Sequence, residues 1–180
     1  MRQARDRFVT RTGLPVGRMR KLAVMSLAVA LAAAGSFIKI PSPVGTVALD
    51  SWPGYLCALL MGPEGSSVAL AGHLASGFTS GFPLGMVLHA LIAVEMCLCA
   101  LAFGWVARRA GVVLGAAVAV VLNGLIAPLA LTPWLGRPLA ASLLLPLSTA
   151  AAVNVSLATA AAKAIVPSLV VRGRSSHEGR

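Results

Sequence analysis

Charged residues are scarce in this chain, and acidic residues are the scarcest. Of the 180 residues, 11% are charged and only five are Asp or Glu, whereas an ordinary soluble domain carries roughly 25% charged residues. Aromatic residues make up only 5% of the chain, while hydrophobic residues make up 58%. This composition excludes an ordinary soluble domain and indicates an integral membrane protein with a single domain.

Motifs of several enzyme classes are also absent. A Walker A loop needs Gly-Lys followed by Ser or Thr, but the only lysines, Lys21, Lys39 and Lys163, follow Arg, Ile and Ala. The chain has no HExxH zinc motif and no GxSxG nucleophile elbow. Its three cysteines lie in apolar runs without the spacing of a metal site or a disulfide framework. The sequence therefore predicts no enzyme, no metal site and no cofactor bound by this chain.

Basic residues gather at the chain ends and in the connections between apolar runs. A net charge of +10 can indicate nucleic-acid binding. Here, however, seven of the fifteen basic residues precede residue 22 and others follow the last apolar run. Such a distribution is typical of membrane orientation, so no nucleic-acid partner is predicted. We predict basic cytoplasmic tails over 1–18 and 169–180 and a membrane domain over 19–168. Met19 is an alternative start.

Apolar runs separated by Gly and Pro predict an all-α fold with six transmembrane helices, the second and third short, and with the N and C termini cytoplasmic. The predicted helices are 22–38, 51–62, 64–79, 84–107, 112–131 and 139–166. With six crossings, only Lys39 and Arg137 of the fifteen basic residues fall outside. Five crossings would put the C-terminal arginines on the wrong face. The two short runs are either tilted spans or a re-entrant pair.

The longest interruption between apolar runs is 35–54, GSFIKIPSPVGTVALDSWPG. It contains three prolines, which forbid a continuous helix, so we predict a shaped loop at one mouth of the helix bundle. Asp50 or Ser51 is placed to cap the next helix, and Asp50 is equally suited to contact a ligand. We interpret this loop as the lid of a ligand site.

Polar residues inside the apolar runs should face the bundle interior, because they are costly in lipid. His73 and His89 lie eight residues before and after Gly81, so an antiparallel helix pair places both roughly 12 Å from the turn. They either face one cavity together or each bond a helix carbonyl. Asn123 is expected to contact ligand, while Asn154 is expected to bond between helices.

Four alanines alternate in the first helix, at Ala28, Ala30, Ala32 and Ala34. They form two overlapping pairs of small residues four positions apart, a spacing that lets another helix approach closely.

The alternating alanines, the 35–54 loop with its continuation YLCALLMGPEG, and GHLASGFTSGFPLGMVLHALIAVEM together resemble the substrate-binding S components of energy-coupling factor (ECF) vitamin transporters, over residues 19–166. The strings GTVALDSWPG and TSGFPLG resemble the branch linked to α-ribazole, a cobalamin precursor. The resemblance implies six helices around one vitamin near the outer face, in a bacterial cytoplasmic membrane. It also implies a transmembrane coupling subunit that docks on Ala28 and Ala32 or on Ala30 and Ala34, and two ATPase subunits that use ATP.

The loop, the buried polar residues and the resemblance together predict a substrate-binding set. For α-ribazole, aromatic residues would stack on the benzimidazole and polar residues would bond the ribose. The predicted set is Phe37, Lys39, Asp50, Trp52, His73, Thr79, Phe82, His89 and Asn123. Three alternatives stay open: an S component for riboflavin, pantothenate or biotin, a self-sufficient secondary permease, and a membrane enzyme. A permease would be expected to show inverted repeats, and the short runs at 51–79 have no clear counterpart later in the chain.

Overall fold

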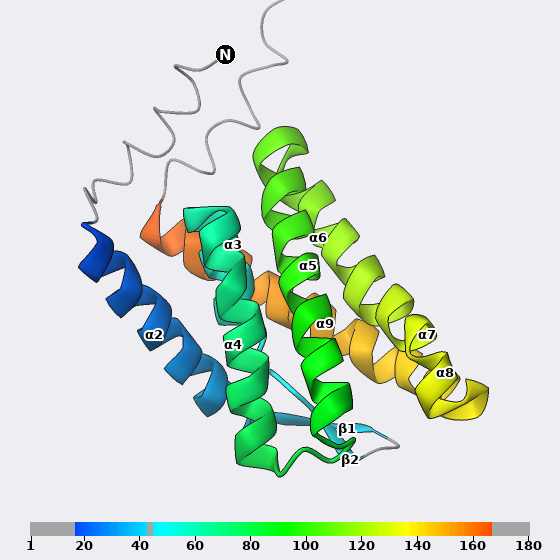
Figure 1. Ribbon diagram of the computed structural model, residues 1–180. Helices are drawn as coiled ribbons and strands as arrows, with labels where there is room; N and C mark the ends of the chain where they lie inside the picture. Colours follow the sequence, from blue (N-terminus) through cyan, green and yellow to red (C-terminus); the bar gives the residue numbers. More distant parts are fainter. Residues whose placement is uncertain (1–16, 43–44, 167–180) are drawn as a thin grey trace, which may run out of the picture.

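The computed structural model describes residues 17–42 and 45–166, and this part of the chain is mostly helical (Figure 1). In chain order its elements are α2 (Arg18–Gly35), β1 (Lys39–Ser42), β2 (Gly45–Ala48), α3 (Trp52–Met61), α4 (Pro63–Ser80), α5 (Met86–Ala110), α6 (Val112–Val121), the π-helical turn η1 (Leu122–Ile126), α7 (Ala127–Ala130), α8 (Thr132–Leu135) and α9 (Arg137–Ile165). The predicted tails lie almost entirely outside the described residues.

Within the described ranges, three helical stretches are long and apolar enough to cross a membrane. They are Met86–Ala110, Val112–Ala130 and Arg137–Ile165. Large apolar side chains on their outer faces are exposed, such as Leu98 at 58%, Val113 at 85% and Leu145 at 77%. A bilayer would cover these faces. The protein is therefore a helical membrane protein, as predicted.

Glycine and proline end the helices where the sequence predicted breaks. The α3 and α4 helices are separated at Gly62, with φ of +77°, followed by Pro63 in the first turn of α4. Gly81 ends α4 in the left-handed conformation that glycine adopts at low cost. The first helix ends at Gly35 and not at Ile38 as predicted. There, the backbone N–H of Phe37 and that of Ile38 form turn hydrogen bonds to Ala34 and Gly35 before the chain becomes extended.

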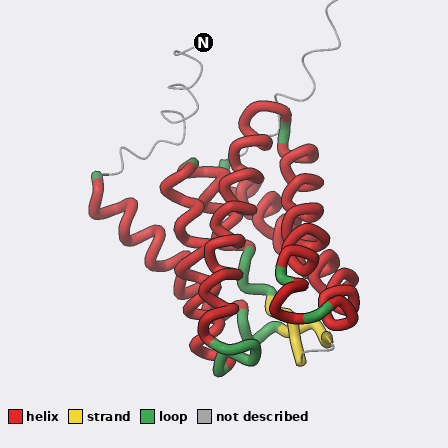
Figure 2. Tube along the Cα trace, turned by 45° about the vertical axis from the view of Figure 1, so that its right-hand side comes forward, coloured by secondary structure: helices red, strands yellow, loops and turns green. Residues whose placement is uncertain are grey.

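The loop predicted over 35–54 contains a short antiparallel β-hairpin, which is a correction to a purely helical fold. Strands β1 and β2 pair in the register Lys39↔Ala48, Ile40↔Val47, Pro41↔Thr46 and Ser42↔Gly45. A two-stranded ribbon tolerates Pro41, because both strands are edge strands. The N–H of Leu49 donates to Ile38 O at 2.9 Å and continues the pairing toward the helices. The hairpin crosses one end of the helix bundle (Figures 1 and 2).

The helices pack closely around α3. Gly54 on α3 lies so near Ala69 on α4 that an added Cβ would come within 2.7 Å of the Ala69 Cβ. Tyr55, fully buried, packs edge-on against Phe103 of α5 with ring centroids 5.5 Å apart. Small residues thus let α3, α4 and α5 approach, which is a common way for membrane helices to associate.

The described basic residues divide between the two ends of the bundle. The start of α2, the end of α5 and the end of α9 share the upper end in Figure 1, while the hairpin and the start of α9 lie at the lower end. Arg18, Arg20, Lys21, Arg108, Arg109 and Lys163 belong to the first group, and Lys39 and Arg137 belong to the second. This division matches the charge bias used for the topology prediction.

Candidate functional site

Two histidines from neighbouring helices meet near the hairpin end of the bundle. Nδ1 of His89 on α5 lies 3.3 Å from Nε2 of His73 on α4, so the two side chains share one hydrogen bond. Their rings stack at 28° with centroids 5.4 Å apart. The prediction that both side chains lie at one depth is therefore met, because α4 and α5 run antiparallel from the turn at Gly81.

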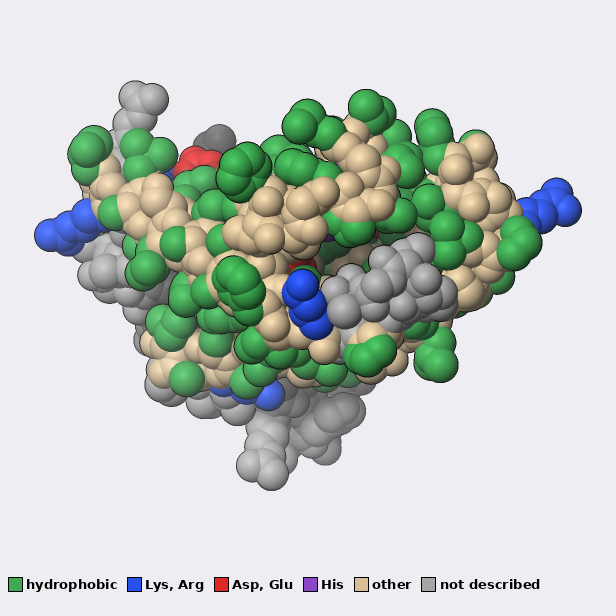
Figure 3. Space-filling model, turned by 90° about the horizontal axis from the view of Figure 1, so that it is seen from below, with side chains coloured by type: hydrophobic (Ala, Val, Ile, Leu, Met, Phe, Trp, Pro, Cys, Tyr) green, Lys and Arg blue, Asp and Glu red, His purple; other side chains and the backbone are tan. Residues whose placement is uncertain are grey.

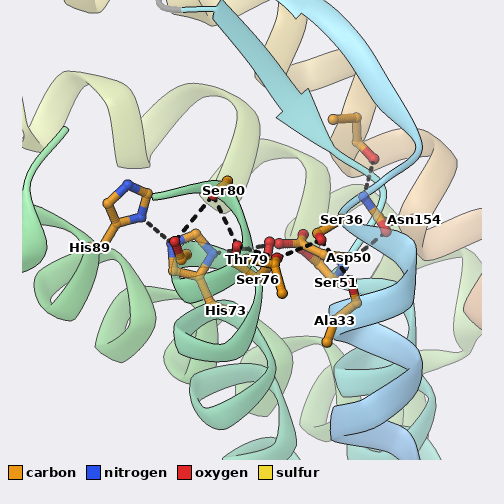
Figure 4. Close-up of polar contacts among 12 residues, drawn as sticks. Ala33, Ser36, Asp50, Ser51, His73, Ser76, Thr79, Ser80, His89 and Asn154 are labelled. Carbon is orange, nitrogen blue, oxygen red and sulfur yellow. Dashed lines mark hydrogen bonds and ion pairs between the residues drawn. The ribbon is translucent and has the colours of Figure 1, made fainter. Parts of the chain in front are cut away.

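Asp50 continues this row from a third segment, the residues between β2 and α3. One carboxylate oxygen, Oδ2, lies 3.9 Å from Nδ1 of His73, on the opposite side of the ring from His89. The other oxygen, Oδ1, accepts a hydrogen bond of 2.9 Å from the hydroxyl of Ser51. Asp50 and His89 are both 7% exposed. The three residues form a nearly buried polar row that joins segments distant in sequence (Figure 4).

The predicted cap of α3 is wrong. Neither Asp50 nor Ser51 makes a side-chain cap hydrogen bond at this helix start. Instead, Oδ1 of Asn154 on α9 accepts the backbone N–H groups of Ser51 at 3.1 Å and Trp52 at 2.9 Å. Asn154 is 1% exposed, and its Nδ2 donates to Ala150 O. The interhelical bond expected for Asn154 is present, and it fixes the segment that carries Asp50.

A pair of hydroxyl groups lies beside the polar row, on the side of α2. The hydroxyl groups of Ser36 and Thr79 are 2.8 Å apart, and Ser36 is 3% exposed. The Thr79 hydroxyl also lies 2.8 Å from Ser76 O, and the Ser36 hydroxyl lies 2.6 Å from Ala33 O. Because each hydroxyl has one proton, one of the two donates to the other, and the second donates to its own helix carbonyl. The contact joins the ends of α2 and α4. Sequence analysis missed Ser36 because a serine just after a helix looks like an ordinary turn residue.

Phe82 packs against the histidine pair from the turn between α4 and α5. It has φ of +49°, which is unusual for a bulky residue and is often found at functional sites. Its ring lies edge-on to His89, with centroids 5.3 Å apart and an angle of 67°. Gly77 makes room for it, since an added Cβ there would come within 2.6 Å of the Phe82 ring.

The structure does not gather the rest of the predicted set around this row. Phe37 is 72% exposed, and Lys39 has an exposed side chain on β1. Trp52 packs against the hydrophobic core. Asn123, in η1, is buried and donates to the hydroxyl of Tyr55 at 3.0 Å, so its amide bonds between helices. The structure therefore brings together Asp50, His73, Phe82 and His89, with Thr79 at the edge.

The two alanine pairs of α2 differ in burial. Ala28 and Ala32 are 7% and 1% exposed and pack inside this chain. An added Cβ on Gly72 of α4 would come within 2.7 Å of the Ala32 Cβ. Ala30 and Ala34 are exposed. The second pair is therefore the one left for contact with another helix.

Figure 3 shows the hairpin end of the molecule face on. Acidic and histidine atoms are visible in a hollow of this face, next to a Lys or Arg side chain. An open groove of about 270 Å³ lies elsewhere, between α2 and α4, with Leu22, Met25, Val29 and Val68 among its lining residues. Its lining is mostly apolar and includes no member of the polar row. The polar row, which joins hydrogen-bonding groups and an aromatic edge, is thus the better candidate for a ligand site.

Among the described residues, no three His, Cys, Asp or Glu side chains gather as a metal-binding group. The row offers hydrogen-bond acceptors, ring donors and hydroxyl groups, which suit the recognition of a small polar molecule. Comparison with protein-family models, with curated proteins and with solved structures gives no match for this chain.

Proposed function

We propose that this protein captures a small molecule from outside the cell as the substrate-binding S component of an ECF-type importer. The observation that carries the proposal is the row Asp50–His73–His89, which two helices and the segment after the hairpin build together at one end of a membrane bundle. A nearly buried polar row is costly in an apolar bundle and calls for a functional reason. In this proposal six helices cross the membrane and both termini are cytoplasmic.

The proposed ligand is a vitamin or a vitamin precursor, with α-ribazole as the first choice. Its benzimidazole would lie against the Phe82 ring, and its ribose hydroxyls would bond the polar row. The hairpin lies over the same end of the bundle and would cover the ligand. Riboflavin, pantothenate or biotin would keep the class of protein and change only the ligand.

The proposed partners are a transmembrane coupling subunit and two ATPase subunits, which supply the energy from ATP. Ala30 and Ala34 form the proposed docking face, because Ala28 and Ala32 are already buried inside this chain.

Ligand capture is tested by native mass spectrometry of the purified protein, followed by titration with α-ribazole. We expect a co-purified or added vitamin to bind the chain alone, without ATP. Recovery of biotin, riboflavin or pantothenate would replace the ligand and keep the function. Reconstituted alone in liposomes, the protein should bind its ligand and fail to accumulate it. Accumulation by the chain alone would favour a secondary permease instead.

Docking is tested with matched pairs of variants. Replacing Ala30 and Ala34 by leucine should abolish assembly with the coupling subunit and leave ligand affinity nearly unchanged. Replacing Ala28 and Ala32 by leucine should destabilise the fold itself, since both side chains are buried. Equal yields of the complex from the wild type and the Ala30/Ala34 variant would remove the assignment.

A further inference from the structure

The His89 ring has one nitrogen without a hydrogen-bond partner in the described part of the chain. Nδ1 is engaged with His73, while Nε2 is buried and has no hydrogen-bond partner among the described residues. The residue as a whole is 7% exposed. Figure 4 shows the second ring nitrogen of His89 directed away from His73. Buried polar atoms are nearly always bonded, so this nitrogen is a candidate contact for a bound molecule.

The neighbouring groups determine whether this nitrogen donates or accepts. The Asp50 carboxylate accepts a hydrogen bond from Ser51 and lies 3.9 Å from Nδ1 of His73, which is too long for a hydrogen bond but close enough for its negative charge to favour a proton on that nitrogen. The carboxylate therefore favours the tautomer of His73 with its proton on Nδ1. The lone pair of a neutral His73 is then on Nε2, facing His89.

The same rule applies to the second ring. Because Nε2 of His73 accepts, Nδ1 of His89 must carry the proton of their shared 3.3 Å bond. A neutral His89 then has its lone pair on Nε2. The order of protons along the row thus leaves an acceptor at its free end.

Resting on the proposed function, we propose that His89 Nε2 accepts a hydrogen bond from the ligand, and that this contact selects a ligand with an O–H or N–H donor beside an apolar or aromatic part. The Phe82 ring, 5.3 Å from that of His89, contacts the apolar part. A carboxylate at this position is disfavoured, because it would face a lone pair in a row that already contains the carboxylate of Asp50. The selected class is a small uncharged or cationic donor, such as a sugar hydroxyl on a heteroaromatic base.

The positions of the protons on the two histidine rings are tested without any ligand. The chain has only three histidines, His73, His89 and His177, so ¹⁵N-histidine labelling in detergent micelles gives few signals, assigned with the His177→Gln variant. We expect His73 and His89 each to carry the proton on Nδ1 and none on Nε2 at neutral pH. A proton on Nε2 of His89 in the free protein would overturn the inference, whatever the ligand is.

The ligand contact is tested with two substitutions, one that keeps a donor near the place of Nδ1 and one that keeps an acceptor near the place of Nε2. In His89→Asn, the side-chain amide keeps a donor near the place of Nδ1 and has no atom at the place of Nε2. In His89→Gln, an acceptor is retained near Nε2. Loss of a buried hydrogen bond should weaken α-ribazole binding about 10- to 100-fold in His89→Asn, and clearly less in His89→Gln. Equal affinities of wild type and His89→Asn would refute the contact.

Monodeoxy analogues of α-ribazole then identify the donor. The analogue that lacks the bonded hydroxyl should lose affinity for the wild type and lose none for His89→Asn, because the contact is already absent there. If the wild type binds α-ribazole but every analogue loses the same affinity in both proteins, the inference fails and the proposed function stands. If the wild type binds no vitamin at all, the proposed function fails. The proton positions measured by ¹⁵N labelling still decide whether Nε2 of His89 is an acceptor.

Discussion

Replacing Asn154 by alanine should destabilise the protein more than most single substitutions, because this side chain links the start of α3 to α9 through both its oxygen and its nitrogen. Its Oδ1 accepts the N–H groups of Ser51 and Trp52, and its Nδ2 donates to Ala150. The side chain is 1% exposed, so water cannot readily replace it. A buried donor left without an acceptor costs about 1–3 kcal/mol. The N–H groups of Ser51 and Trp52 are partly buried, so each should cost toward the lower end of this range. We expect a loss of roughly 2–4 kcal/mol in the free energy of unfolding.

The measurement is reversible unfolding in mixed detergent micelles, with Asn154→Ala compared with Ser156→Ala, an exposed position on the same helix. Hydrogen exchange supplies the local readout, since the amides of Ser51 and Trp52 should exchange much faster in Asn154→Ala only. A change below about 0.5 kcal/mol, the size expected of a surface substitution, with unchanged exchange at both amides would show that the α3 start does not depend on this cap.

Two further predictions test close contacts of glycines, and a third tests the topology. Gly72→Ala should destabilise the α2–α4 pair, because the new Cβ comes within 2.7 Å of that of Ala32; thermal unfolding should show recovery in the double variant Gly72→Ala/Ala32→Gly, and no recovery would refute the steric account. Gly77→Ala should displace the Phe82 ring from His89 and weaken ligand binding at least several-fold with little change in melting temperature; unchanged binding would exclude a role for Phe82. In a background without native cysteines, Lys39→Cys should react with a membrane-impermeant maleimide on intact cells and Arg109→Cys only after lysis; the reverse pattern would invert the topology.

Local signals in the sequence were sufficient to place the helices and the histidine pair. Gly62 and Pro63 separate α3 from α4, and Gly81 ends α4, as their backbone preferences require. Equal spacing of His73 and His89 about Gly81 then brings the side chains to one depth in any antiparallel pair. Prediction succeeded here because the turn and the rise per residue determine the geometry without knowledge of the remaining helices.

Contacts between distant segments could not be predicted in the same way. The cap of α3 comes from Asn154, about a hundred residues later, and the nearer Asp50 is turned toward His73. Asn123 lies in a π-helical turn and bonds Tyr55, and no pattern in that run indicates either the turn or the partner. The hairpin was missed because its strands lack the period-two alternation typical of strands and contain Pro41.

Asn154 also connects the stability of the fold to the placement of protons on His73 and His89 in the candidate site. It holds the backbone of Ser51, next to the Asp50 carboxylate that favours a proton on Nδ1 of His73. Loss of the cap should let Asp50 move and change the tautomer balance of His73 and then that of His89. We therefore expect the ¹⁵N signals of both rings to shift in Asn154→Ala, whereas Asn123→Ala, which removes a buried bond elsewhere, should leave them in place. Unchanged ring signals in Asn154→Ala would mean that the Asn154 cap does not control the proton order in the row.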